Sequence, residues 1–310
     1  MRWTVHNISR RDFLKIGAGF AVAGLLPKTL FSLEPTTHRG PVLSVAHGEP
    51  SRLVAAAVDA LGGINSFIQS GDRVCIKPNI SFAANVDCGA TTNPLIVKQI
   101  VQLCLDAGAE KVIVLDHTIA DAVLCVEKSR IEEAIIDPKR VVLLTPTKER
   151  QFTDVQVPRG TELQTIKVAK AVLEADKLIN VPTAKSHSAT GVSLGIKNLM
   201  GLVWDRAYLH RVNLHKAIAE LATVIKPDLT IVDATRALTS GGPGGPGKTI
   251  ALNKVIAGTD LVAVDSYAVG LTPWYNRSFV GANVKYIAAA HELDIGEIDT
   301  NKMHITAVET

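Results

Sequence analysis

Short apolar runs alternate along this chain with longer stretches whose apolar residues recur at helical spacing. The short runs predict strands at 42–46, 73–77, 111–115, 140–144, 178–181, 229–233 and 250–257. The longer stretches predict helices at about 51–61, 94–107, 123–135, 209–226, 260–270 and 280–293. Uniformly apolar strands separated by helices are typical of an α/β fold, with a mostly parallel sheet and helices on both faces.

Local signals refine this pattern at several points. Ser51 is the expected cap of the first helix, and the second begins with Pro94 and ends before Gly108. The polar segment 152–167 interrupts the alternation and predicts a hairpin-forming insertion. We expect one α/β domain over residues 32–310, preceded by a separate segment at 1–31.

The first 31 residues resemble an export signal. Ser9-Arg10-Arg11-Asp12-Phe13-Leu14-Lys15 precedes a glycine-diluted apolar run at 16–26, which is typical of a twin-arginine signal and short for a membrane span. The only Ala-x-Ala site of this leader, Ala21–Ala23, lies inside the run, so both cleavage and retention as an anchor stay open. We expect the twin-arginine translocase to deliver the folded chain to the periplasm or the outer face of the inner membrane.

Positive charge is concentrated in the leader, which holds five basic residues and one acidic residue. Of the 33 basic and 30 acidic residues in the chain, 28 and 29 therefore remain for the body. A nearly neutral body without basic runs lacks the electrostatic pattern of nucleic-acid binding, so no nucleic-acid partner is expected. The oligomeric state is not predicted by any of these features.

The stretch 178–203 is the strongest candidate for a ligand site. Its apolar strand stops at Pro182, and a polar loop with Lys185 and His187 leads into a glycine-interrupted apolar helix that carries Lys197 and Asn198. A loop between a strand and a helix is a common ligand position in α/β proteins. Cationic and amide groups among apolar residues are costly to desolvate without a partner. The missing partner is expected to be an anionic small molecule.

Polar residues also follow other predicted strands, at the edge where parallel sheets bind ligands. Lys77 and Asn79 are two residues apart in an extended segment and point to the same side. Asp116 and Asp233 end two further strands. Each residue alone is more often a cap or a loop ion-pair partner, and it is their convergence that favours a site.

A glycine-rich segment matches the spacing of a phosphate-binding loop. Gly242–Thr249 satisfies G-x-x-x-x-G-K-[ST], but the following residues 250–256 are β-like, and Pro243 and Pro246 remove two backbone amides from the cradle. We therefore expect no nucleotide hydrolysis. The segment from Gly241 and Gly242 to Gly247 is interpreted as a lid or a close-approach loop over the ligand.

Metal and cluster chemistry lack their usual signatures. His210 and His215 are five residues apart, roughly 140° around a helix, and are expected to be solvated rather than to share an ion. No cysteine pair has C-x-x-C spacing, so the sequence predicts no metal ligands and leaves any cofactor open. The four cysteines allow either disulfides or buried thiols, and predicted strand and helix positions favour buried thiols. Nor is there a G-x-S-x-G nucleophile motif.

Several motifs, taken together, resemble the domain of unknown function 362 family. They follow one another in one order over about Val74 to Gly270: Ile76–Asn79, Thr91–Pro94, Lys185–Gly201, Pro227–Asp233, Gly241–Pro243 and Ala257–Asp265. The resemblance implies an α/β domain but no particular reaction. Many relatives carry a ferredoxin module, whereas this sequence contains no C-x-x-C-x-x-C run, so an intrinsic iron–sulfur cluster is not expected.

The resemblance also implies a set of motif residues in this sequence: Lys77, Asn79, Lys185, His187, Lys197, Asn198, Asp233, Asp260 and Asp265. Some have structural alternatives. Asp260 is a natural helix N-cap, Asp265 can accept from loop amides, and Lys197 with Asn198 can cap a helix that ends at Gly201.

These patterns predict an exported enzyme that acts on an anionic small molecule or cofactor at the carboxyl edge of its sheet. His187 is the expected general acid or base, and the lysines, including Lys185, are expected to stabilise developing negative charge. The alternative is a non-catalytic binding or accessory protein of a redox or organic-acid pathway.

Overall fold

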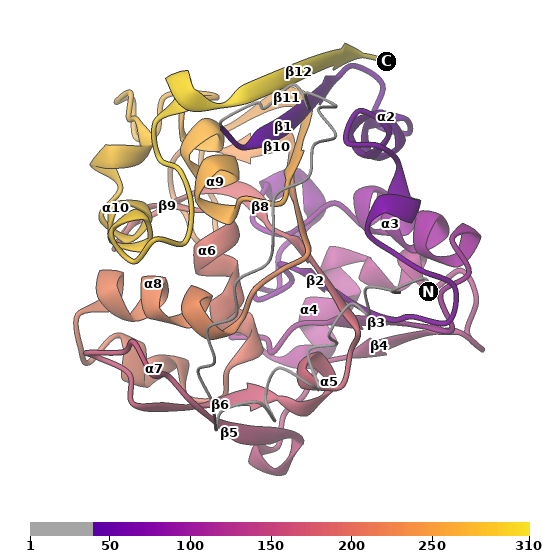
Figure 1. Ribbon diagram of the computed structural model, residues 1–310, viewed down its shortest axis with the longest axis horizontal. Coiled ribbons are helices and arrows are strands. Elements are labelled where there is room, and N and C mark those ends of the chain that lie inside the picture. Colours follow the sequence, from indigo (N-terminus) through magenta and orange to yellow (C-terminus); the bar gives the residue numbers. More distant parts are fainter. Residues whose placement is uncertain (1–39) are drawn as a thin grey trace, which may run out of the picture.

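The computed structural model describes residues 40–310, which form one large sheet between helical layers (Figure 1). The strands follow one another across the sheet in the order β12 (His304–Glu309), β1 (Val42–His47), β11 (Thr249–Gly258), β10 (Leu229–Leu238), β7 (Lys177–Val181), β2 (Arg73–Pro78), β3 (Lys111–Leu115) and β4 (Val141–Leu144). From β10 to β4 every pairing is parallel, whereas β11 is antiparallel to both of its neighbours. The predicted α/β class and mostly parallel sheet are confirmed.

Helices cover both faces of this sheet, as expected. Figure 1 shows α2 (Leu53–Asp59) and α3 (Pro94–Asp106) on one side, with α6 (Gly195–Asn198), α8 (Leu214–Val224), α9 (Leu261–Val269) and α10 (Lys285–Glu292) on the other. The remaining helices are α4 (Ala122–Ser129), α5 (Lys170–Leu173), α7 (Arg206–Leu209), and the 3-10 turns η1 (Ile64–Ser66), η2 (Val86–Cys88), η3 (Ile131–Ala134), η4 (Glu149–Gln151), η5 (Leu199–Leu202), η6 (Gly281–Asn283) and η7 (Thr300–Lys302).

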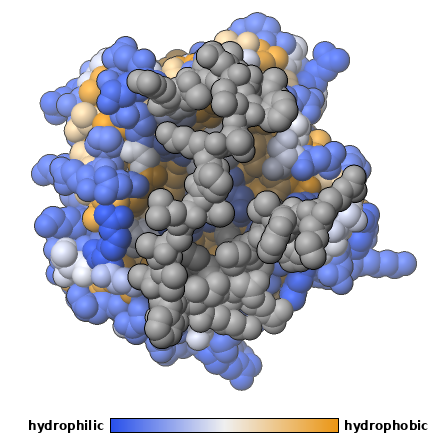
Figure 2. All heavy atoms as spheres, in the orientation of Figure 1, coloured by the Kyte–Doolittle hydropathy of each residue, from blue (hydrophilic) through white to orange (hydrophobic). Residues whose placement is uncertain are grey.

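Two apolar layers, one on each face, form the core. On β2, Val74 and Ile76 pack in the layer of α2 and α3, whereas Cys75 between them packs in the layer of α8 and α9. Because successive strand residues point to opposite faces, a strand covered on both faces must be apolar throughout. Hydrophilic residues form much of the rim of the face in Figure 2. The described residues contain no helix that is long and apolar enough to cross a membrane.

The largest departure from the predicted elements lies in the candidate site. Lys185 and His187 belong to a buried strand, β8 (Thr183–His187), and not to a loop. β8 pairs in parallel with β10 and antiparallel with β9 (Gly191–Ser193). The helix that follows is short, since α6 spans four residues and continues as η5.

Other differences concern the ends of elements. The N-cap of α2 is Arg52, without a side-chain hydrogen bond, so the cap expected at Ser51 is wrong. The helix predicted at 123–135 breaks at Arg130, which has a φ of 57°. The helix predicted at 209–226 is confined to α8, and the C-terminal strand β12 was not predicted. The expected hairpin is present as β5 (Phe152–Gln156) and β6 (Thr165–Ala169).

Candidate functional site

The carboxyl ends of neighbouring parallel strands bring three predicted residues together. Lys77 lies near the end of β2, Asn79 follows that strand, and Asp116 follows β3. All three are buried, and Lys77 and Asp116 are 0% exposed. The strand-end argument therefore located these side chains correctly.

Lys77 and Asp116 form a buried ion pair. Lys77 Nζ lies 3.0 Å from Asp116 Oδ1, and it also donates to Pro78 O and, over 3.2 Å, to Asn198 Oδ1. Burial lowers the pKa of Lys77, and the Asp116 carboxylate opposes that shift. A Cβ on Gly201 would lie 2.1 Å from Asp116 Oδ1, so glycine is required for this close approach. Lys77 is thus held inside the protein, behind the site.

Asn198, on α6, links this ion pair to the rest of the site. Its Oδ1 accepts from Lys77 and, over 3.0 Å, from Asn79 Nδ2. Its Nδ2 donates to Lys77 O over 3.1 Å and to Asn180 Oδ1 over 2.9 Å. With its amide engaged on both sides, Asn198 is suited to orienting its neighbours.

Lys185 projects from β8 into the site and is 1% exposed. Its Nζ donates to Asn79 Oδ1 over 2.9 Å and to Ala90 O over 2.6 Å, and it lies 4.8 Å from the centre of the Phe82 ring. Burial lowers the pKa of Lys185 to about 7, because the charged form loses its hydration. Lys185 is therefore poised to change protonation state near neutral pH.

His187, two residues further along β8, is held as a neutral ring. Its Nδ1 lies 3.1 Å from the amide of Ala189, which donates to it, so the proton of the neutral ring is on Nε2. Burial, with the positive charges of Lys197 and Lys185, lowers the pKa of His187 to about 3. At neutral pH the ring offers an N–H donor and not an imidazolium proton.

Lys197, on α6, is a buried cation without an acidic partner among residues 40–310. It is 6% exposed, and its Nζ lies 3.3 Å from Met200 Sδ, a weak acceptor. Burial lowers the pKa of Lys197 to about 8, and Arg206 adds to the effect. Arg206 donates to the carbonyl oxygens of His117, over 2.6 Å, and Thr118, over 2.5 Å. Neither contact neutralises its charge.

These side chains surround a cavity of about 80 Å³, called here the cationic cavity. Its wall contains Asn79, Ser81, Phe82, Ile119, Lys185, His187, Ser193, Lys197, Asn198, Met200, Gly201, Arg206, His210 and Pro243. The wall has three cationic side chains and no carboxylate, because Asp116 lies behind it, against Lys77. The electrostatic environment favours an anion.

The glycine-rich segment lies beside this cavity. Pro243 is in the wall, and the amide of Gly242 donates to Ser186 Oγ over 3.1 Å. Thr239 N donates to Lys248 O over 2.7 Å, so the segment is the loop of the β10–β11 hairpin. Because Thr249 begins β11, no helix starts at the Gly-Lys step, as the β-like pattern predicted. Gly241 has a φ of 79° and supports the turn.

Three predicted ligand residues make structural contacts outside the cavity wall. Asp233 accepts from Asn93 N and Thr235 N, over 2.7 and 3.0 Å, and lines a separate cavity of about 160 Å³. Asp260 caps α9 by accepting from Ala263 N over 2.8 Å.

Asp265 accepts from the amides of Gly195 and Ile196, over 2.6 and 2.8 Å, and burial raises its pKa to about 7. It therefore holds the start of α6. The structural alternatives for Asp260 and Asp265 describe these contacts well, and neither residue is kept in the proposed site.

Several residues of the cavity wall were not predicted. Arg206 gives no local signal, because it lies on a four-residue helix and its carbonyl partners follow β3. His210 was expected to be solvated, and it is exposed, yet it reaches the cavity wall. Phe82 packs near Lys185 and would have been found only by extending the loop after Asn79 into the site.

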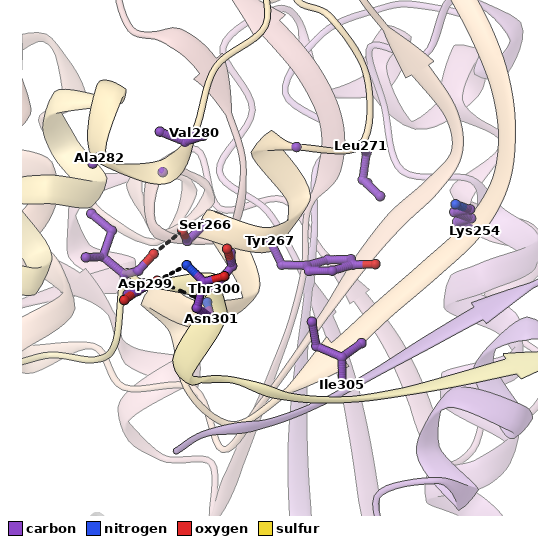
Figure 3. Close-up of a pocket in the computed structure, with 13 residues that line it drawn as sticks. Lys254, Ser266, Tyr267, Leu271, Val280, Ala282, Asp299, Thr300, Asn301 and Ile305 are labelled. Atoms are coloured by element: carbon purple, nitrogen blue, oxygen red, sulfur yellow. Dashed lines mark hydrogen bonds between the residues drawn. The ribbon is translucent and has the colours of Figure 1, made fainter. Parts of the chain in front are cut away.

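The largest cavity of the described residues, about 670 Å³, lies elsewhere (Figure 3). Ser266 and Tyr267 of α9 face Asp299, Thr300 and Asn301 across it. Ser266 Oγ donates to Ile298 O over 2.6 Å at its edge. No set of buried charged groups converges on this cavity, which distinguishes it from the cationic cavity.

Metal ligation receives no support from residues 40–310. They contain no group of three or more His, Cys, Asp or Glu side chains that could hold a metal ion. His210 follows α7, whereas His215 lies on α8, so they belong to different helices. Cys75, Cys104 and Cys125 are buried.

Comparisons with known proteins agree with the leader and with the resemblance noted from motifs. Residues 7–27, outside the described residues, match the twin-arginine translocation pathway signal model, so the protein is exported. A thylakoid-associated protein of Synechocystis sp. is 27% identical over 217 residues, which are 67% of this chain and 65% of that protein. The chain thus matches just under two thirds of that relative's length.

Among solved structures, a lactate racemase apoprotein from Thermoanaerobacterium thermosaccharolyticum covers 74% of this chain and 56% of its own. Its TM-score is 0.43 at 14% identity, a similarity too low to carry an argument. The family comparison is decisive, because one model matches residues 74–270, the span that the motifs delimit. The chain belongs to the family described as Domain of unknown function (DUF362).

Proposed function

We propose that this exported protein is an enzyme that binds a small anionic molecule in the cationic cavity and acts on it there. The observation that carries the proposal is Lys197, a 6% exposed ammonium for which residues 40–310 provide no acidic partner. A buried charge without a partner is costly, and a bound anion would supply that partner. Export places this activity in the periplasm or at the outer face of the inner membrane.

Three kinds of group divide the work in this proposal. Lys197 and Arg206 attract and hold the anion, since both line the cavity without acidic neighbours in its wall. His187 donates its Nε2–H to an oxygen on which negative charge develops. Lys185 is the group that gains and loses a proton, because its pKa is lowered to about 7.

This assignment modifies the roles expected from the sequence. A histidine with a pKa of about 3 is a poor proton carrier at neutral pH, so proton transfer passes from His187 to Lys185. Such a tuned lysine favours an enzyme over a passive binding protein, because binding alone does not require a group that titrates near neutrality. The non-catalytic alternative shares the anion and lacks the turnover.

Calorimetric titration of the full chain with formate, acetate, glycolate and phosphate tests the binding step. We expect at least one anion to bind, Lys197→Met to weaken it by roughly 10-fold or more, and Lys98→Met, at an exposed position of α3, to leave it unchanged. Equal binding by wild type and Lys197→Met would refute the anion site.

Turnover separates the enzyme from the binding protein. The molecule that co-purifies with the protein is identified by mass spectrometry and incubated with fresh protein. Conversion that is lost in Lys185→Met, while binding persists, supports catalysis. Recovery of the unchanged molecule from wild type supports the binding protein instead.

A further inference from the structure

The amine of Lys185 is held in a geometry that suits a nucleophile. Its Nζ donates one hydrogen to Asn79 Oδ1, over 2.9 Å, and another to Ala90 O, over 2.6 Å. Two donated hydrogens and the bond to Cε leave one tetrahedral direction at the nitrogen. In the neutral amine this position is a lone pair, on a side chain that lines the cationic cavity.

The surroundings of Lys185 favour the neutral amine. Both hydrogen-bond partners are uncharged oxygens, and the third neighbour is the Phe82 ring, 4.8 Å from Nζ. Burial and the positive charges of Lys77 and Lys197 disfavour an ammonium, and Asp116, which favours one, is already paired with Lys77. Lysines become nucleophilic when they are desolvated beside other cations.

We propose that Lys185 forms a covalent imine with the carbonyl carbon of a small 2-oxo acid bound in the cationic cavity. This inference rests on the proposed function, because the same anion site holds the carboxylate against Lys197 and Arg206. His187 donates Nε2–H to the carbonyl oxygen. A cavity of about 80 Å³ has the volume of roughly three water molecules, so the acid must be as small as glyoxylate or pyruvate.

The step balances without an oxidant or a cofactor. The Lys185 lone pair attacks the carbonyl carbon to form a C–N bond, and the carbonyl oxygen takes up a proton to give a carbinolamine. The C–O bond then breaks, and the oxygen leaves as water with the two amine hydrogens. One proton from solvent converts the imine to an iminium, which withdraws electrons from the former carbonyl carbon.

Reductive trapping tests this step on the full chain. The protein is incubated at pH 7 with glyoxylate or pyruvate and sodium cyanoborohydride, and the modified lysines are mapped by peptide mass spectrometry. We expect the reduced adduct on Lys185, at least ~10-fold above any exposed lysine such as Lys98, whose amine is protonated at this pH. Lys185→Met removes the adduct, and Lys98→Met does not.

Two further probes separate this inference from the proposed function. Acetate carries the carboxylate without the carbonyl and should compete with trapping, whereas acetaldehyde carries only the carbonyl and should label Lys185 poorly. Acetate binding with no adduct at Lys185 overturns the imine and leaves the anion site. Equal labelling of Lys185 and exposed lysines, or equal labelling by acetaldehyde and glyoxylate, also overturns it. Absence of both binding and adduct rejects the proposed function.

Discussion

Replacing Lys197 by methionine isolates the charge for which the cationic cavity has no acidic partner. The side chain is 6% exposed, and its Nζ has the thioether of Met200 at 3.3 Å. Methionine preserves most of the apolar stem, and the loss of a contact to a weak acceptor leaves little unsatisfied. The substitution therefore removes a buried charge and almost nothing else.

The magnitude follows from the pKa of Lys197, which burial lowers from 10.5 to about 8. That difference corresponds to roughly 3 kcal/mol of unfavourable free energy in the folded, protonated state. Below pH 8 the folded and unfolded chains both carry the proton, so the whole penalty is present. Between about pH 8 and 10.5 the unfolded chain binds more protons, and the stability of the wild type rises with pH.

Urea unfolding of the full chain, without added anion, measures this effect. At pH 7 we expect Lys197→Met to exceed the wild type by up to roughly 3 kcal/mol in free energy of unfolding, and at pH 10 most of that difference should vanish. Lys98→Met, at an exposed position of α3, should change neither value. A variant less stable than the wild type at pH 7, or a difference independent of pH, would refute the reasoning by showing that Lys197 is already neutralised.

Three further predictions test other parts of the chain. Changing Arg10 and Arg11 to Lys should retain the protein in the cytoplasm, because the export receptor distinguishes guanidinium from ammonium; fractionation with normal periplasmic accumulation would contradict this. Lys248→Ala should leave anion and ATP binding by calorimetry unchanged, since the segment is a hairpin loop; ATP binding lost in the variant would reveal a true phosphate loop. Gly201→Ala should lower the free energy of unfolding by about 1–3 kcal/mol, because its Cβ would lie 2.1 Å from a carboxylate oxygen of the buried ion pair. Gly270→Ala, whose Cβ would meet its nearest atom at 3.5 Å, is the matched control and should be nearly neutral in the same urea assay.

Sequence patterns predicted most of the sheet, because its strands are apolar on both faces. The strand predicted at 111–115 has the bounds of β3, and the hairpin insertion is present as β5 and β6. β8 escaped because its sequence, Thr-Ala-Lys-Ser-His, is mostly polar although all five residues are buried. Its Lys185 is satisfied by Asn79 and Ala90, which lie 106 and 95 residues away in sequence. No local pattern encodes such partners.

The site was predicted to the extent that strand ends determine it. Lys77, Asn79 and Asp116 follow from the rule that parallel strands present their carboxyl ends at one edge. The rule does not say which acid pairs with which lysine, and Asp116 is taken by Lys77 and is thereby lost to the cavity. Arg206 entered through contacts with backbone carbonyls 88 and 89 residues distant, which no side-chain motif reveals.

The cations of this edge therefore divide into two layers with different roles. Lys77 is neutralised by Asp116 and does not reach the cavity wall, but through Asn198 it fixes the amide of Asn79. Asn79 in turn presents Oδ1 to Lys185, 2.9 Å from its Nζ. A buried ion pair adds little net stability by itself, since desolvation offsets its attraction. Its value here is geometric, because it orients the two amides that hold the amine of Lys185 at the cavity wall.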